Sequence, residues 1–320
     1  MTSIAWGSDA HGSGDPRDHP TLIDLASDDL ELSLAPTIGG AIAAFRFKAT
    51  DGHRIDLLRP MDAAALVKGD VLGASCFPLT PFSNRLRLGR CHFQGQDIRL
   101  AANSDGPHTE HGHGWQRAWQ VDQKAADQAS LTYRHQPDEW PFAYEMCQHF
   151  RLAGPVLEIT IEGRNTGETP MPYGFGLHPY FARTDQCRLT APVHGFWAVD
   201  DEVMPTTLLP VPASANLTTG INIDDVELDN AFTGWSGDAN IAWPEHALQL
   251  IMKASSPLRF LVVYVPRGED YFCAEPVSNS TDAFNLCHSR DDTGMLILDP
   301  GEQVQATIRF TVAPLASMAL

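Results

Sequence analysis

The chain has 320 residues, of which 43% are apolar, and 40 acidic residues outnumber 22 basic ones to give a formal net charge of -18. This length supports one or two domains with a substantial buried core, and the apolar fraction excludes an intrinsically disordered protein. The excess of carboxylates disfavours nucleic acid as a partner, because phosphate binding needs clustered Lys and Arg.

The first 20 residues are polar and contain no apolar segment, so they predict neither a signal peptide nor a membrane anchor. We expect residues 1–20 to form a flexible arm and residues 21–320 to form a single domain. No Cys-x-x-Cys pair occurs, so the sequence predicts no zinc or thioredoxin motif. We interpret the six cysteines as reduced residues of a cytoplasmic protein: Cys76, Cys91, Cys147, Cys187, Cys273 and Cys287.

Strand patterns begin early in the chain. Residues 31–34 and 42–47 predict two strands around a turn at Gly39-Gly40, where glycine supports a tight change of direction. Residues 62–68 predict the one helix, and it is short.

The second half of the chain carries the clearest strand signals. In residues 156–162 and 303–312, apolar and polar residues alternate with a period of two, as in a strand with one buried face. Residues 258–265 are almost continuously apolar, which is typical of a central strand covered on both faces. Many strands, frequent turns and almost no helix predict an all-β fold, one large antiparallel β-sandwich.

The first candidate site segment is residues 76–86, in which two prolines and two aromatic residues precede Asn84 and Arg85. The Arg85 guanidinium offers five donors in a fixed fork, which suits the hydroxyls or carboxylates of a ligand. The alternative is a surface arginine in an ion pair.

The second segment, residues 108–115, holds three histidines within six positions. His111 and His113 would share one face of an extended segment, as in some two-histidine metal sites. No carboxylate follows at the expected distance, however, and the intervening glycines indicate a loop, so we predict no metal. We favour an uncharged donor site beside Trp115, because carbohydrate sites combine polar donors with a stacking aromatic ring.

The remaining candidates are one imidazole and two acids. His178 precedes Pro179, which pushes it into an extended conformation, and an imidazole so held can titrate near neutrality. Asp229 lies just before an aromatic residue, and Glu275 ends an apolar strand before Pro276. Desolvation there raises the pKa of a carboxyl toward a value useful for a base. A half-buried structural histidine and an exposed glutamate are the alternatives.

Taken together, these segments resemble the aldose 1-epimerase, or galactose-mutarotase-like, family from Leu30 to Leu315. The resemblance implies the large antiparallel β-sandwich called a supersandwich, and it departs from many members at Glu110, where they carry an apolar residue. It rests on five motifs in the family's order: Phe77-Pro78-Leu79-x-Pro81-Phe82-Ser83-Asn84-Arg85, His111-Gly112-His113-Gly114-Trp115, His178-Pro179-Tyr180-Phe181, Leu228-Asp229-Asn230-x-Phe232 and Glu275-Pro276.

The resemblance also implies an activity: an isomerase that interconverts the α and β anomers of a free aldose without a cofactor. It implies His178 as general acid and Glu275 as general base. Ring opening removes a proton from the C1 hydroxyl and delivers one to the ring oxygen, so we expect a protonated His178 facing an ionised Glu275 near neutral pH. The implied substrate-binding residues are Arg85, Asn84, His111, Asp229 and Trp115.

Two alternatives stay open. One is a non-catalytic carbohydrate-binding β-sandwich, and the other is a mutarotase or epimerase for a phosphorylated or acidic sugar. An anionic sugar needs basic side chains in the pocket, for which the motif segments offer Arg87, Arg90, Arg117 and Arg183 besides Arg85. We expect a monosaccharide substrate, no nucleic acid, no membrane, and a monomer or homodimer.

Overall fold

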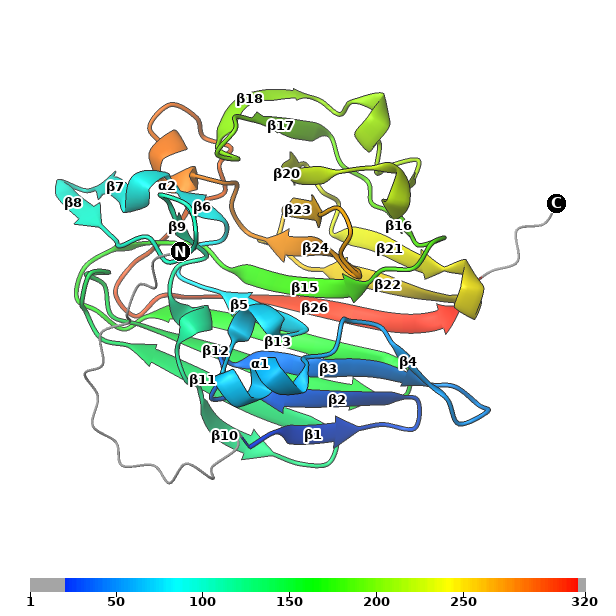
Figure 1. The fold of residues 1–320 in the computed structure, drawn as a ribbon. Coiled ribbons are helices and arrows are strands. Elements are labelled where there is room, and N and C mark those ends of the chain that lie inside the picture. Colours follow the sequence, from blue (N-terminus) through cyan, green and yellow to red (C-terminus); the bar gives the residue numbers. More distant parts are fainter. Residues whose placement is uncertain (1–20, 316–320) are drawn as a thin grey trace, which may run out of the picture.

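The computed structural model describes residues 21–315 (Figure 1). The arm expected over residues 1–20 lies outside the described residues. The helices are α1 (Ala63–Lys68) and α2 (Ala283–Leu286), with short 3-10 turns η1 (Val71–Gly73), η2 (Arg87–Gly89), η3 (Gly114–Gln116), η4 (Ala213–Ala215), η5 (Ile223–Asp225) and η6 (Pro244–His246). The strands are β1 (Ile23–Ala26), β2 (Leu30–Ala35), β3 (Ala41–Lys48), β4 (Arg54–Asp56), β5 (Cys76–Leu79), β6 (Arg85–Leu86), β7 (Arg90–Phe93), β8 (Gln96–Arg99), β9 (Thr109–Glu110), β10 (Gln120–Lys124), β11 (Gln128–His135), β12 (Tyr144–Ala153), β13 (Val156–Asn165), β14 (Met171–Tyr173), β15 (Gly176–Ala182), β16 (Arg188–Thr190), β17 (Gly195–Val199), β18 (Pro205–Pro210), β19 (Ile221–Asn222), β20 (Leu228–Thr233), β21 (Asp238–Trp243), β22 (Leu248–Ala254), β23 (Phe260–Val265), β24 (Tyr271–Val277), β25 (Leu296–Leu298) and β26 (Gln303–Pro314).

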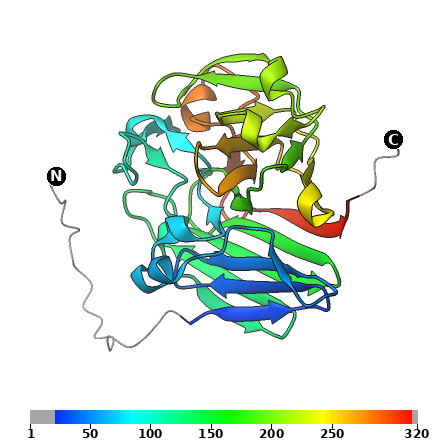
Figure 2. The same cartoon turned by 45° about the vertical axis from the view of Figure 1, so that its right-hand side comes forward.

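Two large antiparallel sheets form the body of the fold. The first has the strand order β1-β2-β3-β5-β15-β24-β23-β20-β17-β18, with β4 paired to β3, and the second has the order β10-β11-β12-β13-β26-β22-β21-β16-β19. In Figure 1 the first sheet rises from β1 at the bottom to β18 at the top, and Figure 2 shows the two layers from another side. The prediction of an all-β antiparallel sandwich is confirmed.

The apolar faces of the two sheets meet in a shared core. β13 and β26 carry the alternating patterns seen in the sequence, and they pair with Ile159 opposite Ile308. Phe310 reaches across the core to Phe45 and Phe181 of the first sheet, with ring centroids 6.2 and 6.3 Å apart. Burial of these alternating side chains is therefore what holds the layers together.

The predicted local elements are also confirmed. α1 begins after Asp62, whose side chain accepts a hydrogen bond from the backbone N–H of Ala65, and it ends at Gly69 in the left-handed conformation. β23 is a central strand of the first sheet, and nearly all its side chains are buried. Among the described residues, no helix combines the length and apolar character needed to cross a bilayer.

The outer face of the first sheet, which points away from the second sheet, is where the polar motifs gather. On β15, Leu177 and Phe181 belong to the core between the sheets, whereas the alternate residue Tyr180 packs in a separate cluster on the other face. β24 divides in the same way, with Phe272 in the core and Cys273 on the outer face. Because side chains alternate along a strand, His178 and Glu275 also point to the outer face.

The segment between β5 and η3 folds over this outer face. Thr80 and Gly112 form an isolated parallel bridge, and the backbone N–H groups of His113 and Gly114 both donate to the Thr80 carbonyl. Gly112 has φ +66°, and a Cβ there would lie 2.2 Å from the Thr80 carbonyl oxygen. Only glycine permits so close an approach, which brings the loop of His111 next to β5.

Candidate active site

His178 and Glu275 are direct neighbours across two central strands. The pairing of β15 with β24 sets Gly176 opposite Val277 and Tyr180 opposite Cys273, so the register places His178 opposite Glu275. The Nε2 atom of His178 lies 3.4 Å from Oε1 of Glu275, and the two side chains are 9% and 3% exposed. Glu275 thus lies inside a central strand, not at the strand end that the sequence indicated.

Both members of this pair keep one polar atom without a hydrogen-bond partner. Nδ1 of His178 and Oε2 of Glu275 are buried and unpartnered among the described residues. Buried polar groups in proteins are nearly always satisfied, so each such atom needs an explanation. A bound ligand that forms hydrogen bonds with these two atoms would explain both, and such a ligand agrees with an acid–base site.

Aromatic side chains hold the His178 imidazole in place. Its ring stacks on Phe77 of β5 and on Tyr180 of β15, with centroids 4.7 and 4.6 Å away. The ring of His111 meets it edge-on at 5.1 Å. Packing on these sides fixes the direction of the ring nitrogens, as proton transfer requires.

Burial moves the pKa values of the pair in opposite directions. It lowers the pKa of His178 well below its ordinary value, and the nearby His111, Arg59 and Arg85 add to the effect. It raises the pKa of Glu275 well above the ordinary value, assisted by Asp229 and Glu110. Both shifts favour the uncharged forms, a neutral imidazole and a protonated carboxyl, whereas the sequence led us to expect a protonated His178. The reason is desolvation, which depends on burial in the fold.

His111 is an uncharged donor. The backbone N–H of Asn84 donates to its Nδ1 at 3.0 Å, and its own N–H donates to the Asn84 carbonyl at 2.9 Å. Since Nδ1 accepts, the proton of the neutral ring sits on Nε2. Burial, with the adjacent Arg85, lowers the pKa of His111 to about 3, so the ring stays neutral. Both residues have positive φ, near 60°, which is uncommon outside glycine and concentrates at functional sites.

Arg85 lies between two carboxylates. Its Nε is 3.0 Å from Oε1 of Glu110, and its Nη2 is 3.4 Å from Oδ2 of Asp229. Burial raises the pKa of Asp229, while Arg85 acts to lower it. Asp229 is on β20 opposite Tyr264 of β23, so the sheet itself brings it toward the site.

Trp115 and His113 lie behind the site. Trp115 is 3% exposed, stacks on Phe77 at 5.3 Å, and donates from Nε1 to the Glu110 carbonyl. Its stacking on a sugar stays a prediction. His113 packs on His135 at 4.3 Å and contacts the Tyr144 hydroxyl at 3.0 Å through Nε2. His111 and His113 therefore have separate partners.

One group of side chains is suited to hold a metal ion. Among the residues that the structure describes, ligand atoms of His178, Cys273 and Glu275 lie within 4.8 Å of one another. Burial raises the pKa of the Cys273 thiol well above its ordinary value, so a metal would have to displace that proton. Sequence reasoning missed Cys273 as a site residue, although its i, i+2 spacing from Glu275 on a strand placed both on one face.

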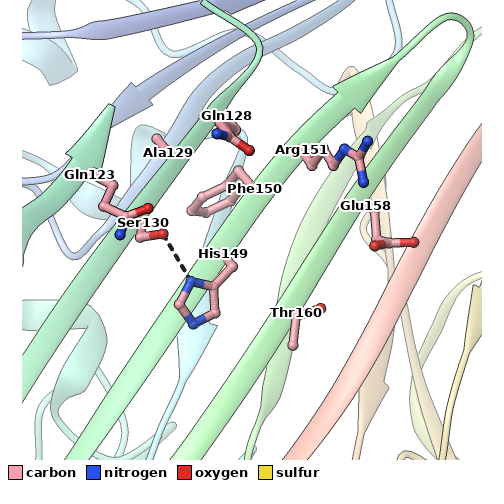
Figure 3. Close-up of a pocket in the computed structure, with 9 residues that line it drawn as sticks. All are labelled: Gln123, Gln128, Ala129, Ser130, His149, Phe150, Arg151, Glu158 and Thr160. Atoms are coloured by element: carbon pink, nitrogen blue, oxygen red, sulfur yellow. Dashed lines mark hydrogen bonds between the residues drawn. The ribbon is translucent and has the colours of Figure 1, made fainter. Parts of the chain in front are cut away.

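One hollow in the described chain lies elsewhere, on the outer face of the second sheet (Figure 3). It measures about 250 Å³, and its His149 is exposed and bonded to Ser130 at 2.9 Å. Its carboxylate, Glu158, is paired with Arg309. The residues that line this groove include no buried acid–base pair, so the candidate active site is the one on the first sheet.

The fold and the face that carries the acid–base pair define a galactose-mutarotase-like β-sandwich. A galactose mutarotase-like protein of Clostridium acetobutylicum superposes with a TM-score of 0.82 at 18% identity, over 91% of this chain and 94% of that one, which supports the fold alone. Residues 22–311 match the aldose 1-epimerase family. The chain belongs to that family, which is one of isomerase-type enzymes.

A curated protein and a solved structure from Escherichia coli K12 are each matched over 99% of their own length. The uncharacterized protein YphB is 30% identical over 302 residues, which cover 91% of this chain and 99% of that protein. A crystal structure described provisionally as an aldose 1-epimerase has a TM-score of 0.82 at 29% identity and covers 92% of this chain and 99% of its own. These matches extend well beyond the motifs, so the likeness is to the whole fold.

Proposed function

We propose that the protein is a mutarotase that interconverts the α and β anomers of a free aldose by acid–base ring opening and closing. The observation that carries the proposal is the contact of His178 with Glu275. Both side chains are buried, each has one polar atom without a hydrogen-bond partner, and burial shifts their pKa values in opposite directions. Positioned acid and base groups each contribute about 10²–10⁴-fold to such a reaction.

The spacing of the pair suits the substrate. The hydroxyl oxygen that loses a proton and the ring oxygen that gains one are both bonded to C1 of the sugar. An acid and a base that serve them must therefore also lie close together, as His178 and Glu275 do at 3.4 Å. Glu275 takes the proton of the C1 hydroxyl and His178 gives one to the ring oxygen. After rotation about C1–C2, the same groups act in reverse.

The proton inventory of the pair also suits the reaction. A neutral imidazole beside a protonated carboxyl carries two protons, the same number as an imidazolium beside a carboxylate. Sugar oxygens that contact the unpartnered Oε2 of Glu275 would favour the charged arrangement, since hydrogen bonds to a carboxylate stabilise its ionised form. The site therefore needs no net proton uptake to become reactive.

The remaining candidates bind the sugar in this proposal. Nε2–H of His111 donates to a ring substituent, Arg85 and Asp229 hold hydroxyls, Asn84 fixes the His111 tautomer, and Trp115 supports the wall through Phe77. We place the protein in the cytoplasm, because its six cysteines are free thiols. A purely carbohydrate-binding role would leave the acid–base pair without a task.

The test is Glu275→Gln, which keeps size and hydrogen bonding but cannot accept a proton. Anomer exchange of free aldoses, followed by exchange NMR, should slow by about 10²–10⁴-fold while the thermal unfolding temperature is kept. The control is Glu145→Gln on β12, a carboxylate paired with Arg134 on the second sheet, which should retain full activity. Full activity of the Glu275 variant would remove Glu275 as the base.

A further inference from the structure

Glu110 is a second carboxylate beside Arg85, and the fold fixes its backbone tightly. β9 pairs with β6, so Glu110 lies opposite Arg85 in the ladder. Its backbone N–H donates to Oδ1 of Asn103 at 2.7 Å, and its carbonyl accepts from Nδ2 of Asn103 at 2.8 Å and from Trp115. The backbone at Glu110 is therefore held in place, with its carboxylate beside Arg85.

This carboxylate changes the electrostatics of the site. Arg85 already contacts Asp229, and Glu110 adds a second negative charge 3.0 Å from the same guanidinium. The three side chains together carry a charge of -1, and the His178–Glu275 pair adds none. Side-chain exposures of 20% for Arg85 and 21% for Glu110 limit screening by water. Glu110 also helps to raise the pKa of Glu275, so its charge reaches the acid–base pair.

The other candidate cations are committed elsewhere. Arg87 pairs with Asp282, and Arg183 pairs with Asp224. Arg59 lies over the rings of Tyr180 and Tyr271, 4.2 and 4.4 Å from their centroids, and donates to the carbonyls of Leu72 and Ala74. Arg90 and Arg117 are exposed. Binding a sugar phosphate or carboxylate takes charge-assisted hydrogen bonds from free basic groups, and these arginines do not offer them inside the site.

We propose that Glu110 is a specificity-determining residue that restricts the site to aldoses without a negative charge, namely neutral sugars and protonated amino sugars. It acts by repulsion, because it occupies Arg85 and places a second carboxylate beside that guanidinium, which an anionic sugar would meet there. The inference rests on the proposed function and names the substrate class of the same site.

The experiment compares sugars that differ only in charge. Exchange NMR measures kcat/KM for glucose and galactose and, in each series, for the 2-amino sugar, the uronic acid and the 6-phosphate. The wild-type protein should act on the neutral and amino sugars and at least ~10-fold more slowly on both anions at low ionic strength. Glu110→Gln should narrow this gap by about 10-fold, through KM more than through kcat, whereas Glu145→Gln should leave it unchanged.

The salt dependence of the wild-type protein tests the inference without a variant. The gap between neutral and anionic sugars should shrink as ionic strength rises, because screening weakens repulsion between charges that water reaches. Equal rates for both classes, or a gap that neither salt nor Glu110→Gln alters, would overturn the inference while the mutarotase proposal stands.

Failure of the proposed function has a different signature. If no sugar exchanges faster than in buffer, the activity is wrong, and saturation-transfer NMR of the same sugars then decides the inference. Binding of neutral and amino sugars but not of the anions supports it. Equal binding of all classes, or binding of none, refutes it.

Discussion

His111 and His113 are two residues apart in the chain, yet they belong to two groups of side chains with different hydrogen bonding. The reactive group is His111, His178 and Glu275, and the support group is His113, His135, Tyr133 and Tyr144. In the support group, Nε2 of His135 donates to the Trp140 carbonyl at 2.9 Å, so its Nδ1 accepts from the Tyr133 hydroxyl at 3.3 Å. The reactive group instead retains the unpartnered Nδ1 of His178 and Oε2 of Glu275.

The presence or absence of hydrogen-bond partners distinguishes histidines that stabilise the fold from histidines that are available to react. Each hydrogen bond within the support group satisfies a buried polar atom and lowers the energy of the folded chain. Each unpartnered atom in the reactive group costs stability until a ligand contacts it. The reactive group is distinguished by a buried imidazole and a buried carboxyl that contact each other and that each lack one hydrogen-bond partner.

The largest expected effect is on catalysis. His178→Gln keeps a nitrogen within reach of Glu275 but removes a group that can give and take a proton. Anomer exchange should slow by about 10²–10⁴-fold, with urea-unfolding free energy changed by less than about 1 kcal/mol. Activity near that of the wild type would mean that the ring-oxygen proton comes from another group.

The matched substitution in the support group should lower stability and leave catalysis unchanged. His135→Phe keeps an aromatic ring but removes one of two donors to the Trp140 carbonyl, which retains the N–H of Asp138, and removes the partner of the Tyr133 hydroxyl, which should cost about 1–3 kcal/mol in urea unfolding. The folded fraction should keep its kcat. A tenfold loss of kcat with unchanged stability would place His135 in the reactive group instead.

A smaller effect concerns pH. Glu275 has a folded pKa above its unfolded value of 4.5, so the folded state binds more protons, and stability falls as pH rises from 4.5 through the folded pKa. The lowered pKa values of His111, His113 and His178 give the reverse trend, a loss as pH falls below 6.5. Asp229, whose pKa is also raised, adds to this loss, and the raised pKa values of Tyr133 and Tyr144 in the support group add a loss only above pH 10.

Glu275→Gln isolates that alkaline loss. Relative to the variant, the wild type should lose up to about 1.4 kcal/mol per pH unit above pH 4.5, measured by urea unfolding at a series of pH values. Below pH 4.5 the two proteins should lose stability in parallel, because the histidines remain in both. Parallel curves on the alkaline side as well would mean that the pKa of Glu275 is not raised.

The smallest effect is expected in the groove of the second sheet (Figure 3). Ser130→Ala removes the hydrogen bond to the exposed His149. Stability should change by less than about 0.5 kcal/mol, and anomer exchange should stay at the wild-type rate. A clear loss of activity would extend the functional surface beyond the first sheet.

Much of the fold could be read from local patterns. Three strands were predicted from such patterns: β13 and β26 from period-two alternation, and β23 from a continuous apolar run. These predictions succeed because side chains that will be buried along a strand are apolar in the sequence. The helix at α1 followed from residues 62–68. The pairing order of the strands did not follow, since it depends on contacts between residues far apart in the chain.

For the site, the sequence by itself determined which residue types were available: an imidazole at 178, a carboxylate at 275, and a guanidinium at 85. Only the tertiary structure decided that His178 stands opposite Glu275 across two strands, with one polar atom of each left unpartnered. It also decided that Arg85 is held by both Glu110 and Asp229. Proton affinity and local charge depend on burial and on distances across the fold, and neither is encoded in the spacing of residues along the chain.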